Sequence, residues 1–141
     1  MRAPLAVLAV VGLALGAAAL AVFGLADTGT FVPPPEAEAE SFMRAMATHR
    51  YEQALDHLTD ELRQAGPGAL RARQAEIERR CGHVRDVEGE RSWSSGTSAE
   101  APVRLTAAGG KAVLRFRLVR RRGQWRVASL GEWDPGGPPR R

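Results

Sequence analysis

The sequence of 141 residues contains a single cysteine, Cys81, and can therefore form no intramolecular disulfide. Lysine is almost absent as well, since Lys111 is the only lysine among 20 basic residues, which we attribute to codon usage rather than to chemistry. The sequence has no glycine-rich phosphate loop, no nucleophile elbow and no recognisable Ser-His-Asp arrangement. Without a catalytic signature or a cofactor motif, we expect neither an enzyme nor a cofactor-dependent protein.

Two pairs of residues remain as candidates for chemistry. His57 and Asp60 lie one turn apart in a predicted helix and could form an acid–base pair. The apolar stripe of that helix places His57 at its edge, which favours a solvated pair and leaves both residues weak catalytic candidates. Cys81 and His83 are potential metal ligands, but no second cluster with ligand spacing accompanies them, so we expect no metal site.

The residues Ala3–Ala26 form an uncharged run that follows Arg2. As a helix this run would be about 36 Å long, enough to cross a bilayer core of about 30 Å. It is longer than the apolar region of a typical signal peptide. We therefore predict a single-pass anchor in the cytoplasmic membrane, with the N-terminus inside and the remainder outside. Small residues at its end leave cleavage after Ala26, and hence secretion, open. Because no cysteine follows the run, lipid anchoring of the bacterial lipoprotein type is excluded.

Helical signals follow a Pro-rich spacer, predicted over residues 27–35. The first helix is expected to begin at Pro35 and to bury Ala39, Phe42, Met43 and Met46. A second helix is expected from Tyr51 until Gly66-Pro67-Gly68 stops it. The third is expected over residues 69–81, with Gly82 as its C-terminal cap.

The period then changes to that of β-strands. A weak first strand is predicted over His83–Trp93, and a second over Ala101–Thr106, after a polar loop at residues 94–100. The next turn pairs Thr106 with Lys111, which places apolar residues opposite one another. The sequence therefore predicts an α+β domain over residues 36–130, with about three helices packed on a curved antiparallel meander of about four strands. A disordered tail is predicted over residues 131–141.

The last hairpin, Lys111–Leu130, has one apolar and one basic face. With Arg121-Arg122 as a two-residue loop, Leu118 lies opposite Trp125, and Arg117 lies opposite Arg126. The basic face is predicted to carry Arg104, Arg115, Arg117 and Arg126, mixed with Val113, Val119, Ala128 and Leu130. This face is either a solvated surface or a docking surface for an acidic protein partner. Nucleic acid is not expected, because the domain is predicted to be exported and no aromatic residue is interleaved there.

Charge divides the exported part into two halves. Residues 27–66 carry a net charge of −5 and residues 67–141 a net charge of +8. Such a field could steer a partner or be neutralised within the domain.

Several features together resemble one family. The phrase His49-Arg50-Tyr51-Glu52-Gln53-Ala54, the order of three helices before a meander, and the closing Gly123-Gln124-Trp125-Arg126-Val127 resemble the nuclear transport factor 2-like, or cystatin-like, cone superfamily. Among its members, the chain is most similar to membrane-anchored bacterial proteins of unknown function. The resemblance implies a curved sheet wrapped around helices, with an open mouth. Trp93 and Trp133 lie at element ends, where they would line that mouth as a pocket rim or cap the core edge.

These expectations favour one function and leave a second open. The first is an extracytoplasmic binding or scaffold domain, anchored through Ala3–Ala26, that acts as an accessory subunit of a membrane assembly or as a homodimer. The alternative, which the resemblance implies, is a small-ligand-binding cone or a small-molecule isomerase or hydrolase.

Overall fold

The computed structural model describes residues 32–134. The predicted anchor at residues 1–26, most of the predicted spacer, and residues 135–141 of the predicted tail lie outside this range. Among the described residues, no helix has the length and apolar character needed to cross a membrane. The helices are α2 (Pro35–Ala47), α3 (Tyr51–Leu55), α4 (Asp60–Arg63) and α5 (Gly66–Cys81). The strands are β1 (Val84–Gly89), β2 (Trp93–Ser95), β3 (Ser98–Ala107), β4 (Gly110–Arg121), β5 (Gln124–Val127) and β6 (Glu132–Trp133).

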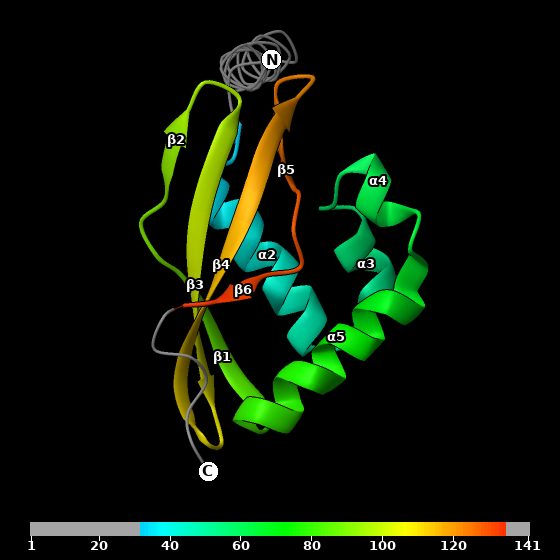
Figure 1. Ribbon diagram of the computed structural model, residues 1–141, viewed down its shortest axis with the longest axis vertical. Helices are drawn as coiled ribbons and strands as arrows, with labels where there is room; N and C mark the ends of the chain where they lie inside the picture. The colour runs from blue at the N-terminus through cyan, green and yellow to red at the C-terminus, as the bar shows by residue number, and fades with distance from the viewer. Residues whose placement is uncertain (1–31, 135–141) are drawn as a thin grey trace, which may run out of the picture. The chain divides into compact units, whose positions relative to one another are not determined.

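The strands form one antiparallel sheet in the order β1-β3-β4-β5, with β2 paired to β3 and β6 paired to β4. Figure 1 shows α2 along one face of this sheet, with α3, α4 and α5 on the side of β5. The α+β class and the curved meander are confirmed. The helix α2 begins at Pro35 as predicted, and its stripe of Ala39, Phe42, Met43 and Met46 is completely buried.

The inside of the curved sheet is filled by apolar side chains. The ring of Phe42 on α2 meets the ring of Phe116 on β4 edge to face, with 5.7 Å between the ring centroids. Phe42, Phe116 and Leu114 all have no exposed surface. Between α2 and β4 the inside of the curved sheet is therefore a packed apolar core.

The prediction of one long second helix is wrong. The chain forms the two short helices α3 and α4, because residues 57–59 between them pair with the edge of β5. The amide of Val127 donates to the carbonyl of His57 at 2.7 Å, and the amide of Thr59 donates to the carbonyl of Val127 at 3.0 Å. Gly66-Pro67-Gly68 begins α5 as well as separating it from α4, with Gly66 at a φ of 79°.

The register between β3 and β4 is confirmed, with Thr106 opposite Lys111 and Ala101 opposite Phe116. The predicted loop at residues 94–100 is wrong, because β2 and the start of β3 form a hairpin there. The predicted first strand is also divided, since β1 ends at Gly89 and β2 begins at Trp93. The strand β3 is long enough to pair with β1 along one part and with β2 along another.

The predicted register between β4 and β5 is wrong by two residues. The turn consists of Arg122-Gly123, which places Leu118 opposite Val127 and Val119 opposite Arg126. Both turn residues have a positive φ, 54° and 76°, a conformation that glycine adopts without strain and that a turn of Arg121-Arg122 would force on two arginines. Because side chains alternate, a shift of two residues keeps the apolar set on the core side. Arg117 and Arg126 are therefore not opposite one another, contrary to the prediction.

The first part of the predicted tail is ordered, contrary to expectation. Glu132–Trp133 forms β6, in which Trp133 lies opposite Leu114 of β4. The guanidinium of Arg73, on α5, donates to the carbonyl oxygens of Leu130 at 3.1 Å and of Gly131 at 2.8 Å. Contacts with distant elements thus hold this segment in place, and its local sequence does not predict them.

We expect Phe116→Ala to lower the free energy of unfolding by about 3–5 kcal/mol, because it removes a fully buried ring that packs on Phe42. Arg117→Ala is the matched control, since this neighbouring side chain is exposed on the opposite face and should cost less than about 1 kcal/mol. Chemical denaturation of the full-length protein in detergent measures both. Equal losses in the two variants would contradict the assignment of the faces.

Candidate functional site

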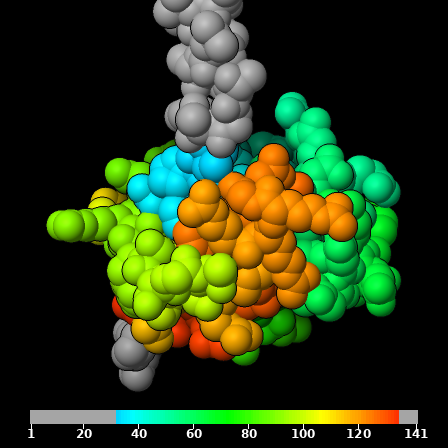
Figure 2. Space-filling view, turned by 90° about the horizontal axis from the view of Figure 1, so that it is seen from above, coloured from blue at the N-terminus to red at the C-terminus, as the bar shows by residue number. Residues whose placement is uncertain are grey.

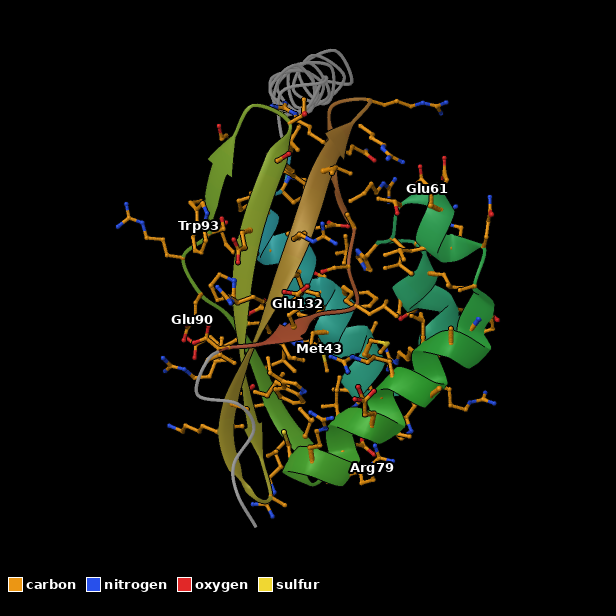
Figure 3. The ribbon with its side chains drawn as sticks, viewed as in Figure 1. Met43, Glu61, Arg79, Glu90, Trp93 and Glu132 are labelled. Atoms are coloured by element: carbon orange, nitrogen blue, oxygen red, sulfur yellow. The ribbon has the colours of Figure 1, made fainter. Side chains whose placement is uncertain are left out.

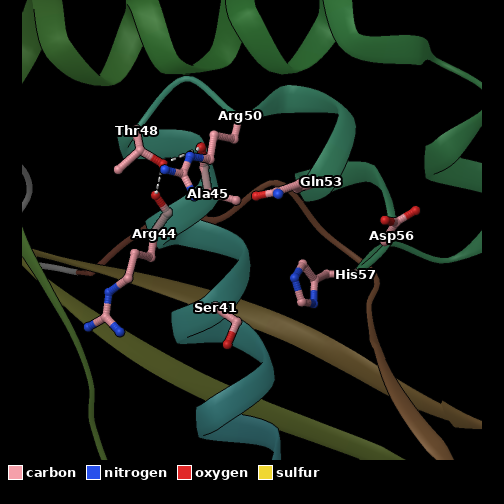
Figure 4. Close-up of a pocket in the computed structure, with 8 residues that line it drawn as sticks. All are labelled: Ser41, Arg44, Ala45, Thr48, Arg50, Gln53, Asp56 and His57. Atoms are coloured by element: carbon pink, nitrogen blue, oxygen red, sulfur yellow. Dashed lines mark hydrogen bonds between the residues drawn. The ribbon is translucent and has the colours of Figure 1, made fainter.

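The largest hollows described in the structure lie on the surface and not inside the cone. One of about 520 Å³ is formed by the outer side of α2, the turn after it, and α3. Figure 4 shows its lining residues, among which His57 is directed toward Ser41 and Gln53. Thr48 closes one end by donating its hydroxyl to the carbonyl of Arg44 at 2.9 Å. A second hollow of about 580 Å³ lies between the end of α2 and β1.

His57 pairs with the carboxylate of Glu38, a contact that the sequence analysis does not predict. Its Nδ1 lies 2.7 Å from Oε1 of Glu38 on α2, and the two side chains are only 26% and 15% exposed. The predicted partner, Asp60, is exposed in the first turn of α4 and lines a different hollow. The helix break at residues 57–59 separates His57 from Asp60, so the predicted pair is not formed. An imidazole held by a carboxylate is an arrangement that general bases use. Among the described residues, however, the structure gives no hydrogen bond between His57 and a hydroxyl or thiol nucleophile.

The outer face of the meander is not uniformly basic, because some of its arginines form ion pairs with carboxylates. Arg104 contacts Glu90 at 2.5 Å, and Arg115 lies between Glu100 at 3.4 Å and Asp134 at 3.1 Å. Arg126 donates to the carbonyl of Asp56 and, at 2.9 Å, to the side chain of Gln124. Arg117 is exposed opposite Glu100 in the register. Val113 and Val119 are half-buried on the same face. Two of the four arginines of this face, Arg104 and Arg115, are therefore neutralised by carboxylates, whereas Arg117 and Arg126 have no carboxylate contact among the described residues.

Neither predicted rim tryptophan lines any of the five hollows described. Trp93 is 55% exposed on β2, where Figure 3 shows it away from the helices. Trp133 is paired opposite the core residue Leu114, and the guanidinium of Arg73 lies 6.0 Å from the centre of its ring. Trp133 is thus held beside β4 by strand pairing and lies near a guanidinium of α5.

The structure brings together a cluster of arginines near the β4–β5 turn that the sequence analysis does not predict. Four of them, Arg63, Arg121, Arg122 and Arg126, line a hollow of about 350 Å³ together with Asp60. Arg121 holds both carboxylate oxygens of Glu61 on α4, at 2.6 and 2.9 Å. This hydrogen-bonded pair lowers the pKa of Glu61 and raises that of Arg121. The run Arg120-Arg121-Arg122 was the available signal, but the predicted register assigned its last two residues to the turn and the separate helix α4 was not predicted.

Residues 32–134 contain no group of three or more His, Cys, Asp or Glu side chains that could hold a metal ion. Cys81 is buried at the end of α5. His83 is exposed, and its Nδ1 lies 3.9 Å from Glu78.

Solved structures similar to this one identify the fold. No protein-family model matches the chain, and no curated protein sequence matches it. A Campylobacter jejuni protein described as a "Putative NTF2-like transpeptidase" matches 69% of this chain and 99% of its own, with a TM-score of 0.54 and 17% identity. RPA3114 from Rhodopseudomonas palustris, a SEC-C motif containing protein, matches 70% of this chain and 77% of its own, with a TM-score of 0.53 and 20% identity. The described domain therefore has an NTF2-like fold, as the resemblance implied.

The pairing of Glu61 with Arg121 has a consequence for titration. We expect the pKa of Glu61 to lie below its ordinary value and to rise toward that value in Arg121→Gln, which removes the hydrogen bonds to its carboxylate. Arg122→Gln is the control, because Arg122 lies in the same hollow but does not contact Glu61. Carboxyl carbon NMR titration of the three proteins measures the effect. A Glu61 pKa that is unchanged in Arg121→Gln would mean that the pair does not persist in solution.

Proposed function

We propose that this protein is a single-pass, membrane-anchored binding or scaffold domain on the outer side of the cytoplasmic membrane. It contacts a protein partner, or a second copy of itself, through the outer face of β3 and β4. The observation that carries this proposal is the packed interior, where Phe42, Phe116 and Leu114 have no exposed surface. Because the interior is packed, a partner would have to bind the outer surface of the domain.

The outer face has the chemistry of a protein contact. Half-buried Val113 and Val119 lie toward the two ends of the outer face of β4, with ion-paired Arg115 and exposed Arg117 between them. Interface centres are typically depleted of unpaired charge and bordered by polar groups. Since Arg104 and Arg115 already have carboxylate partners, the partner surface is expected to be of mixed charge rather than strongly acidic. This replaces the acidic partner suggested by the sequence.

A second candidate is a small-molecule enzyme or ligand-binding protein. The His57–Glu38 pair favours it, because a part-buried imidazole with a fixed carboxylate can accept a proton from a bound substrate. Both side chains line a hollow of about 240 Å³, and His57 also lines the hollow of about 520 Å³. Both hollows are open to solvent, however. A substrate bound there would not be shielded from water as it is in most active sites.

The partner surface is tested by recovery from detergent-solubilised membranes after cross-linking. We expect Arg117→Glu/Val119→Lys to reduce partner recovery at least about tenfold, because it reverses one charge and places another at a half-buried valine of the same face. Arg115 is left unchanged because it holds Asp134 beside β6.

Two matched variants complete this experiment. Arg79→Glu makes the same charge reversal on α5 (Figure 3) and should leave recovery unchanged. His57→Ala should also leave it unchanged if binding, rather than chemistry, is the function. Equal recovery of the same partners by wild type and Arg117→Glu/Val119→Lys would show that this face is only a solvated surface.

The placement of the domain is tested by thiol labelling. Thr97, in the exposed β2–β3 turn, is replaced by cysteine, and intact spheroplasts are treated with a membrane-impermeant thiol reagent. We expect full labelling, because Arg2 is the only charged side chain before Ala3–Ala26 and orients that run with its N-terminus inside. Buried Cys81 provides the background measured in the parent protein. Labelling only after the membrane is permeabilised would contradict the proposed topology.

A further inference from the structure

The β4–β5 turn carries positive charge that the domain does not neutralise. Arg120, Arg121 and Arg122 are consecutive and all exposed. Arg121 is paired with Glu61, whereas the side chains of Arg120 and Arg122 have no carboxylate partner among the described residues. Arg122 also occupies a left-handed turn position, with a φ of 54°, where Asn, Asp or Gly is usual. An arginine at this position has a conformational cost, and Arg122 lies in the turn at the end of the hairpin.

This turn lies at the end of the domain where the described chain begins. Pro33 lines one hollow together with Gln124, Trp125 and Arg126, so the start of the domain is beside β5. Figure 2 shows the residues at the start of α2, in cyan, next to the β4–β5 hairpin, in orange, on one face. The β2–β3 turn reaches the same end, because the amide of Arg120 donates to the carbonyl of Thr97 at 2.7 Å.

Chain length limits how far this face can be from the membrane. Only the residues from Asp27 to Val32 separate Ala26, the end of the predicted anchor, from Pro33. Even a fully extended chain spans at most about 25 Å over this interval. If Ala3–Ala26 crosses the bilayer, Pro33 can lie at most about 25 Å from the end of the anchor, so this end of the domain is within reach of the headgroups.

We propose that Arg120 and Arg122 dock the domain onto anionic phospholipid headgroups of the membrane that holds its anchor. The inference rests on the proposed membrane anchoring and extends it to the orientation of the domain. Each arginine near an anionic surface favours the docked form by about fivefold, and salt weakens the effect. Docking at this end fixes the direction in which the outer face of β3 and β4 is presented to a partner.

The test uses the full-length protein in lipid nanodiscs with a fluorophore on Thr97→Cys and a quencher on the lipid headgroups. One set of discs contains phosphatidylcholine alone, and the other an equal mixture of phosphatidylcholine and phosphatidylglycerol. We expect stronger quenching in the anionic discs, a decrease of this excess at high salt, and its loss in Arg120→Glu/Arg122→Glu. Arg121 is left unchanged so that its pair with Glu61 remains.

The control Arg79→Glu/Arg91→Glu makes the same change in net charge at two exposed positions on α5 and in the β1–β2 loop, and should keep the excess quenching. Equal quenching in neutral and anionic discs would overturn the docking proposal, as would equal loss of quenching in both double variants. Membrane anchoring is read separately, by alkaline carbonate extraction of the wild type from liposomes. Release into the supernatant would contradict the anchor itself, whereas retention without excess quenching would contradict only the docking.

Discussion

The backbone pairing of Val127 with residues 57–59 positions both the His57–Glu38 pair and the Glu61–Arg121 pair. Through its amide and its carbonyl, Val127 binds His57 and Thr59, and this interrupts what would otherwise be one helix. The interruption leaves His57 facing Glu38 on α2 and starts α4 at Asp60, capped by the hydroxyl of Thr59. The short helix α4 then brings Glu61 to Arg121 on β4. Three parts of the chain that are distant in sequence are thus positioned by one short parallel bridge.

The sequence was sufficient to predict those features that depend on local periodicity. The buried stripe of α2 and the cap at Gly82 follow from helical spacing and from glycine's freedom to adopt a positive φ, here 84°. The β3–β4 register follows from two alternating patterns and a glycine-rich turn. These signals act between neighbouring residues, so a single sequence contains them in full.

The features that could not be predicted depend on tertiary contacts. The pairing of Glu38 with His57 requires α2 and the α3–α4 connection to be adjacent, which no spacing encodes. The segment at Leu130 and Gly131 is held by Arg73 from α5, although its own composition is typical of a tail. The β4–β5 register had a local determinant, the glycine at position 123, but pairing the apolar sets alone did not distinguish two registers that differ by two residues. The alternation of apolar and polar residues determines which face of the sheet each side chain occupies. The turn determines which residue of the next strand lies opposite it.

Charge is distributed unevenly over the surface of the described domain. The acidic first half and the basic second half meet at Glu61 and Arg121, so part of the predicted field is neutralised within the fold. On the outer face, Glu90, Glu100 and Asp134 similarly occupy Arg104 and Arg115. The strand β4 nevertheless retains Arg117 on its outer face and Arg120 and Arg122 at its turn, all without a carboxylate contact among the described residues. Exposed guanidinium groups without internal partners remain available to an external one. The two contacts proposed above therefore use different parts of one hairpin, Arg117 in the middle of β4 for the first, and Arg120 and Arg122 at its end for the second.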